Sequence, residues 1–159
     1  DSVINHTTGV DHCDGSRASA SGYNGDGNFH SIPYTEENLQ DCSKDICGYS
    51  NSDKAQDCPL NSLKDLDNRQ DYAQGKLSEY MNRLLDLGVY GFRVYAVEHI
   101  PTADVDAITA KLAEESGRNA DDIFFEQEVI GNAAYSAAIQ LSNFVASDKV
   151  SEFNFTNHL

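Results

Sequence analysis

Residues 91–99 read Gly-Phe-Arg-Val-Tyr-Ala-Val-Glu-His, and they begin inside a buried strand that we predict over 89–95. The end of this stretch is unusually polar for a buried strand. On an alternating strand, Arg93, Tyr95 and Val97 share one face. Because a buried arginine requires an anionic partner, we expect a carboxylate beside Arg93. A purely structural arginine–carboxylate pair is the alternative to a functional site.

The chain around this strand follows a regular pattern from about residue 70 onward. Short apolar strands alternate with amphipathic helices, which is typical of parallel βα units. In such folds the chemistry lies at the C-terminal ends of the strands. Gly88 and Gly117 are good helix ends, and Thr102 is a candidate N-cap. The predicted elements are helices over 71–87, 102–117 and 133–144, and strands over 89–95, 123–125 and 150–155.

The strand predicted at 123–125 is followed by two acidic residues. Glu126 and Glu128 share a face by alternation. A glutamate at the mouth of a barrel is a candidate general acid, whose pKa would be raised by burial. The alternative is a solvated charge on a loop, and Glu128 by itself does not distinguish the two.

All four cysteines, Cys13, Cys42, Cys47 and Cys58, lie in the first 60 residues, in a stretch rich in Gly, Ser, Asn and Asp. No CxxC pair occurs, and no histidine follows at zinc-finger spacing, which argues against a zinc site. Disulfides in an extracellular loop region fit better, so we expect a secreted protein. Four cysteines allow three pairings, and the sequence alone does not choose among them.

The charge balance narrows the partners. Asp and Glu number 26 against 11 Lys and Arg, giving a formal net charge of −15. This argues against nucleic acid and anionic membranes, because both require a basic face. No apolar run is long enough to span a membrane. The composition suits a soluble secreted protein or one that binds cations.

Two further sequence features concern oxygen ligands and glycosylation. Asn5 and Asp65 offer the hard oxygens that calcium takes, although no contiguous loop motif joins them. Residues 5–7 and 154–156 are N-glycosylation sequons. Both lie at predicted strand ends, so we expect neither to be used.

Three separated segments, in this order, resemble three signature regions of the α-amylases, glycoside hydrolase family 13. Residues 1–6 resemble the region at the end of barrel strand three. Residues 91–99 resemble the second region, which in the family reads Gly-Phe-Arg-x-Asp-Ala-x-Lys-His. Residues 127–129 resemble the third, where the glutamate is the general acid. The resemblance covers nearly the whole chain.

The resemblance implies a partial (β/α)8 TIM barrel, comprising about strands three to six, with an irregular disulfide-bearing domain B inserted after strand three. Residues 1–6 would end strand three, residues 7–66 would form the domain B excursion, and residues 67–159 would supply strands four, five and six. We therefore expect the chain to be an internal piece of a longer catalytic domain, because a barrel does not close on four strands.

The resemblance also assigns roles to individual residues. Glu128 would be the acid/base, Arg93 would orient the nucleophile, and Tyr95 occupies the nucleophile position. The residues expected to bind substrate are His6, Tyr49, Glu98 and His99. The expected calcium ligands are the Asn5 side chain, the Asp65 carboxylate and the backbone carbonyls of Gln56 and His99. Cys42 and Cys58 look like the domain B disulfide of the family, with Cys47 competing with Cys42.

Two positions depart from the family pattern: Tyr95 stands where the family has its nucleophilic aspartate, and Glu98 stands where it has a lysine. A retaining glycosidase needs two carboxyl groups about 5–5.5 Å apart. The expected function is endo-cleavage of α-1,4-glucosidic bonds in starch or glycogen with retention, with activity reduced by Tyr95. The alternative is a non-catalytic α-glucan- or calcium-binding pseudoenzyme. We expect a monomer with calcium as cofactor.

Overall fold

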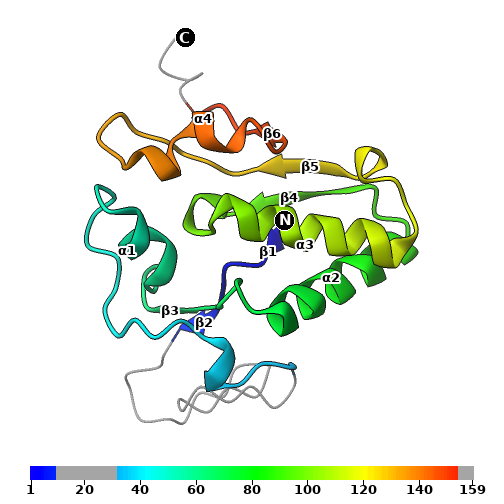
Figure 1. The fold of residues 1–159 in the computed structure, drawn as a ribbon, viewed down its shortest axis with the longest axis horizontal. Coiled ribbons are helices and arrows are strands. Elements are labelled where there is room, and N and C mark those ends of the chain that lie inside the picture. The colour runs from blue at the N-terminus through cyan, green and yellow to red at the C-terminus, as the bar shows by residue number, and fades with distance from the viewer. Residues whose placement is uncertain (10–31, 154–159) are drawn as a thin grey trace.

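The computed structural model describes residues 1–9 and 32–153. Its centre is a parallel sheet of four strands in the order β1-β4-β5-β6 (Figure 1). The strands are β1 (Ser2–Val3), β4 (Gly91–Tyr95), β5 (Phe124–Gln127) and β6 (Lys149–Val150). Each strand pairs in parallel with the next along this order. This confirms the predicted βα units, since neighbouring parallel strands require a crossover connection.

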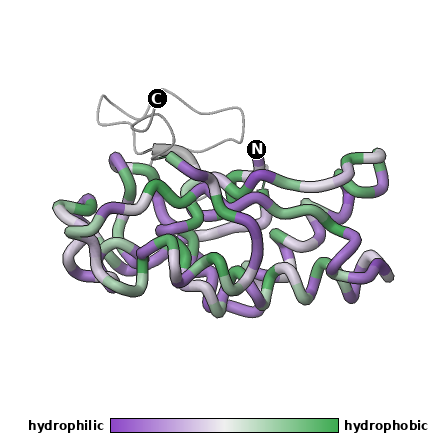
Figure 2. Tube along the Cα trace, turned by 90° about the horizontal axis from the view of Figure 1, so that it is seen from above, coloured by the Kyte–Doolittle hydropathy of each residue, from purple (hydrophilic) through white to green (hydrophobic). Residues whose placement is uncertain are grey.

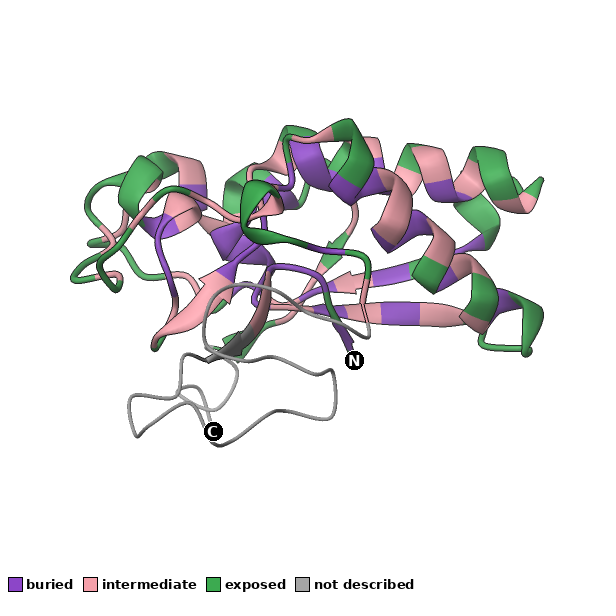
Figure 3. Ribbon diagram, turned by 90° about the horizontal axis from the view of Figure 1, so that it is seen from below, coloured by how far each residue is buried: buried purple, intermediate pink, exposed green. Residues whose placement is uncertain are grey.

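Two long helices cover one face of this sheet, as Figure 3 shows. They are α2 (Asp71–Asp86) and α3 (Thr102–Ser116), which also pack against each other. Apolar side chains recur on each helix at three- and four-residue intervals and are buried against the strands. These core residues are Leu77, Met81 and Leu85 of α2, Val105, Ile108 and Leu112 of α3, and Phe92, Val94 and Phe125 of the sheet.

The helix ends agree closely with the sequence. After α2, Gly88 has a φ of +94°, and α3 is capped at Gly117 with a φ of +65°. Both values lie in the left-handed region that glycine adopts without a steric penalty. The predicted N-cap at Thr102 is wrong by one residue: Thr102 is the first helical residue and Pro101 occupies the N-cap position.

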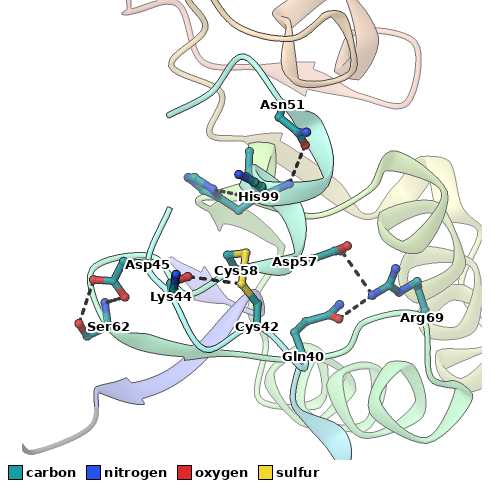
Figure 4. Close-up of a disulfide and its surroundings, with 12 residues drawn as sticks. Gln40, Cys42, Lys44, Asp45, Asn51, Asp57, Cys58, Ser62, Arg69 and His99 are labelled. Atoms are coloured by element: carbon teal, nitrogen blue, oxygen red, sulfur yellow. Dashed lines mark hydrogen bonds and ion pairs between the residues drawn. A yellow bond between two sulfur atoms is a disulfide. The ribbon is translucent and has the colours of Figure 1, made fainter. Parts of the chain in front are cut away.

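The described residues between β1 and α2 form a second, smaller layer. A two-stranded antiparallel sheet pairs β2 (His6–Gly9) with β3 (Leu63–Asp65), and α1 (Ser52–Asp57) lies next to it along the chain. Figure 4 shows the disulfide between Cys42 and Cys58, whose Cα atoms are 5.0 Å apart. This pairing was the one implied by the resemblance. Cys47 is exposed and has no disulfide partner among the described residues, and Cys13 lies outside them.

The helix predicted over 133–144 is wrong. This region contains two short pieces, η4 (Ala137–Ile139) and α4 (Leu141–Phe144). Before them, the Asn132 side chain accepts a hydrogen bond from the Ala134 amide, and the Gln140 side chain donates to the carbonyls of Asn132 and Tyr135. These side chains satisfy backbone groups in a turn and so compete with a continuous helix.

The strand boundaries also differ from the predictions. β4 starts at Gly91 instead of residue 89. At this position β4 and β5 approach so closely that a Cβ on residue 91 would collide with the backbone carbonyl of Phe124. β5 extends to Gln127, and β6 is shorter than predicted, with residue 155 outside the described range. Three 3-10 helices complete the fold: η1 (Glu36–Asn38), η2 (Val97–His99) and η3 (Ala120–Asp122).

Hydrophobic and hydrophilic residues alternate in short segments along the chain, as Figure 2 shows. In the described part of the chain, no helix combines the length and the apolar character needed to cross a membrane.

Candidate active site and calcium site

Glu128 lies just after β5, and both of its carboxylate oxygens have partners. Oε1 is 2.6 Å from Nη2 of Arg93, and Oε2 accepts a hydrogen bond from the backbone amide of Ala96 at 2.8 Å. Ala96 adopts a left-handed conformation with a φ of +53°, immediately after β4. The two neighbouring strand ends therefore converge on one carboxylate, which is mostly buried.

Arg93 has a second carboxylate partner. Its Nη1 donates to Asp1 at 2.8 Å, so one guanidinium bridges Asp1 on one side and Glu128 on the other. The prediction of an anionic partner for Arg93 is confirmed. The prediction that Val97 shares its face is wrong, because the turn at Ala96 ends the alternation and Val97 is fully buried in η2.

Tyr95 ends β4 on the same half-exposed face as Arg93. Its ring meets the His6 ring edge to face, with centroids 5.8 Å apart. Burial, followed by the charge of His99, lowers the pKa of His6 below its ordinary 6.5. The imidazole of His6 is therefore neutral at physiological pH, beside the phenol ring that stands where the family has its carboxylate.

Glu98 is buried within η2, at 4% exposure. Its Oε2 accepts hydrogen bonds from the successive backbone amides of Ile130 and Gly131, at 3.1 and 3.3 Å. Its other oxygen, Oε1, is 3.9 Å from Nε2 of His99. The structure thus turns the Glu98 carboxylate toward the loop after Glu128.

Tyr49 and His99 lie together at the junction of the smaller layer and the sheet. The Tyr49 ring is 5.7 Å from the His99 ring and stacks on Tyr135 at 4.5 Å. The Ser136 amide donates to the Tyr49 carbonyl at 2.7 Å. Burial, followed by the neighbouring Tyr135 and Glu98, raises the pKa of Tyr49. These contacts join the excursion to the loop that follows Glu128.

Asn5 and Asp65 present buried oxygens without hydrogen-bond partners. Oδ1 of Asn5 and both carboxylate oxygens of Asp65 are unpartnered, and the two residues are 1% and 2% exposed. Burial, followed by the charge of Asp57, raises the pKa of Asp65 to about 8, although the neighbouring Asn5 side chain, which lies too poorly oriented for a regular hydrogen bond, lowers it in part. Unsatisfied buried oxygens are rare in folded proteins and call for an explanation, of which a bound cation is one.

The surroundings of these oxygens fit a cation that prefers oxygen ligands. Among residues 1–9 and 32–153, no group of three or more His, Cys, Asp and Glu side chains could hold a metal ion. The unpartnered oxygens of Asn5 and Asp65 are one amide oxygen and one carboxylate, which are hard ligands of the kind that calcium takes. The Gln56 side chain donates to the carbonyls of Glu98 and Ile100 at 3.5 and 3.3 Å, which brings α1 against η2 and His99.

Three residues at the site were assigned no role from the sequence: Asp1, Asp57 and Tyr135. Asp57 could have been identified from its neighbours in the chain, because it lies between Gln56, an expected calcium ligand, and the disulfide-bonded Cys58. Asp1 and Tyr135 contact their partners only through the fold, so no local pattern identifies them. Of the two sequons, Asn5 is buried, and Asn154 lies outside the described residues.

Searches among known proteins found no matching family model. They found an α-amylase of Streptomyces violaceus, 33% identical over 159 residues, covering 100% of this chain and 26% of that protein. Rat pancreatic α-amylase is 32% identical over 98% of this chain, which equals 32% of its own length. An α-amylase of Tribolium castaneum is 41% identical over 70% of this chain and 22% of its own length.

Solved structures give the same result for the fold. The crystal structure of α-amylase I from Eisenia fetida has a TM-score of 0.79 at 31% identity, covering 95% of this chain and 32% of that one. A mutant of the same enzyme, solved as a maltohexaose complex, has a TM-score of 0.78 at 28% identity. The parallel sheet is thus part of a (β/α)8 barrel. The chain belongs with the α-amylases, as a homologue of a segment spanning between 22% and 32% of the length of these relatives.

Proposed function

We propose that the protein carrying this chain is an α-amylase-type glycosidase that cleaves internal α-1,4-glucosidic bonds of starch-like glucans with retention. The single observation that carries this proposal is the position of Glu128, held at two adjacent barrel strand ends by Arg93 and the Ala96 amide. The similarity to α-amylases over nearly all of the chain supports it.

In this mechanism Glu128 donates a proton to the oxygen of the leaving sugar and later removes one from the attacking water. Arg93 fixes the orientation of that carboxylate through a charge-assisted hydrogen bond. His6, Tyr49 and His99 would line the sugar site, whereas the carboxylate of Glu98, which the resemblance also places there, accepts from the loop after Glu128. The domain division that we propose follows the same reading: strand three ends at 1–6, domain B spans 7–66, and barrel units span 67–159.

We further propose a calcium ion bound by Asn5, Asp65 and the backbone carbonyls of Gln56 and His99. Bound there, calcium would supply charge that neutralises the buried Asp65 carboxylate and would tie domain B to the barrel. The support is the set of unpartnered buried oxygens on Asn5 and Asp65. The Cys42–Cys58 disulfide supports a secreted location, where oxidation is favoured.

A second candidate, a non-catalytic glucan-binding protein, is favoured by Tyr95. A phenol is less suited than a carboxylate to attack the anomeric carbon, and its ring occupies space near the sugar. Arg93, the residue expected to orient the nucleophile, pairs here with Glu128 and Asp1. Such a protein would bind the glucan and leave it intact.

Starch hydrolysis by the protein that carries this chain distinguishes the two. The assay compares the natural sequence with Tyr95→Asp, and uses Glu128→Gln as the blank. If the natural sequence hydrolyses starch above the blank, the glycosidase proposal is correct. If only Tyr95→Asp does so, by about 100-fold or more over the blank, the scaffold is that of a glycosidase and the natural protein is a non-catalytic version of it. If neither form exceeds the blank while both bind maltooligosaccharides, the non-catalytic function is correct.

A further inference from the structure

We propose that Glu98 is a positioning residue, whose buried carboxylate holds the loop after β5 so that Glu128 stays in place. This inference rests on the proposed function, because it concerns the loop that carries the acid/base. The family has a lysine at this position, which the resemblance places among the substrate contacts. In this chain the glutamate has a different set of partners.

The contact between Glu98 and the loop has the geometry of an anion site made by backbone amides. One oxygen accepts from two successive N–H groups, those of Ile130 and Gly131. Charge-assisted hydrogen bonds of this kind are roughly twice as strong as neutral ones, and successive amides form concavities that suit anions. A lysine ammonium offers only donors and cannot accept from these amides.

The segment that carries Glu98 is itself held in place by neighbouring elements. Glu98 lies in η2, whose neighbouring carbonyls accept hydrogen bonds from the Gln56 side chain. The adjacent Val97 is fully buried in the core. The carboxylate is therefore presented from a packed part of the fold.

On the loop side, the contact lies two residues after Glu128. Val129 is fully buried, and Gly131 has a φ of +66° with the Leu141 side chain against it. Further along, Tyr135 stacks on Tyr49. The backbone amide of Glu128 donates to the Val94 carbonyl at 3.0 Å, and the hydrogen bonds to Glu98 are the next polar contacts that hold the loop beyond it. Because a displacement of about 1 Å at a reacting group costs about 100-fold in rate, this contact bears directly on Glu128.

Hydrogen exchange in the protein that carries this chain tests the proposal without requiring activity. The variants are Glu98→Ala, Glu98→Lys and Glu98→Gln, whose amide oxygen still accepts hydrogen bonds. The matched control is Glu115→Ala, which removes a carboxylate that accepts from Ser78 on the helical layer. We expect the Ala and Lys variants to exchange the amides of residues 129–135 at least about tenfold faster, with the Gln variant in between and the control unchanged.

The kinetic readout uses the Tyr95→Asp background. Glu98→Gln should lower kcat about tenfold while KM changes less than about twofold, since positioning affects the transition state more than binding. Unchanged exchange at 129–135 in Glu98→Ala and Glu98→Lys would overturn the proposal, as would faster exchange throughout the chain with a lower Tm. Local exchange that rises as expected in a protein without hydrolytic activity would sustain the role of Glu98 and reject the proposed function instead.

Discussion

Replacing Asp65 with asparagine should stabilise the calcium-free protein and remove its response to calcium. In the folded chain, burial raises the pKa of Asp65 from 3.8 to about 8. The folded state therefore binds a proton at this carboxyl more tightly than the unfolded state does. The resulting stabilisation is fully present below about pH 4 and is lost as the pH rises through about 8.

The magnitude follows from these two pKa values. Without calcium, the carboxyl disfavours folding by about 2 kcal/mol at pH 5 and about 4 kcal/mol at pH 7, relative to its fully protonated form. Asparagine carries no charge and escapes this cost, although an amide buried without partners costs about 1–3 kcal/mol itself. The net gain for Asp65→Asn at pH 7 is therefore about 1–3 kcal/mol, or a few degrees in Tm.

Thermal unfolding measures this effect in chelator and in calcium, at pH 5 and pH 7. In chelator, ionisation of Asp65 should lower the free energy of unfolding of the natural sequence by about 2–3 kcal/mol between pH 5 and pH 7. The Asp65→Asn protein should not show this contribution. Calcium should raise the Tm of the natural sequence alone. Asp45→Asn is the matched control, because the Asp45 carboxylate already accepts from Ser62 and its charge does not act on Asp65.

Two results would refute this reasoning. If Asp65→Asn is less stable than the natural sequence in chelator at pH 7, the carboxylate must have favourable partners in the folded state. If Asp65→Asn retains the full calcium-dependent rise in Tm, the ion binds elsewhere.

The remaining predictions concern the disulfide, the packing of the sheet and the orientation of the acid/base. A non-reducing peptide map should link Cys42 to Cys58, and a link to Cys47 would contradict this pairing. Replacing both cysteines by serine should lower the free energy of unfolding by about 3 kcal/mol, because the disulfide closes a loop of this length. Gly91→Ala should lower the free energy of unfolding by about 1–3 kcal/mol in a denaturant titration, because the alanine Cβ would collide with the backbone of Phe124 on the neighbouring strand. An unchanged denaturation midpoint would contradict this packing. In the Tyr95→Asp background, Arg93→Lys should reduce kcat by about 10- to 100-fold, because a lysine lacks the fork that contacts two carboxylates, and unchanged kcat would remove Arg93 from the mechanism.

The sequence predicted the parts of the fold whose patterns are local. Regular apolar spacing identified α2 and α3, and glycines marked where both end. Predictions failed where side chains that are not part of the apolar pattern determine the conformation of the backbone. The segment over 133–144 has the small residues of a helix, but the Asn132 and Gln140 side chains satisfy its backbone as a turn.

The same distinction applies to the candidate site. The resemblance identified Glu128 and Arg93, and alternation predicted an acidic partner for Arg93, which the structure supplies. Strand alternation could not predict the direction of the Glu98 side chain, because the left-handed turn at Ala96 ends the strand and breaks the alternation. The stacking of Tyr135 on Tyr49 joins residues 86 positions apart and depends on the whole fold.

Cys58 directly follows α1, the helix that contains Gln56 and Asp57. The covalent link to Cys42 therefore restrains the segment that supplies part of the proposed calcium site. In a newly synthesised chain before oxidation, that segment is held only by non-covalent contacts and has more conformations to lose on binding the ion. The proposed site should therefore bind calcium more weakly in the reduced chain than in the oxidised one, so that forming the disulfide would favour metal loading.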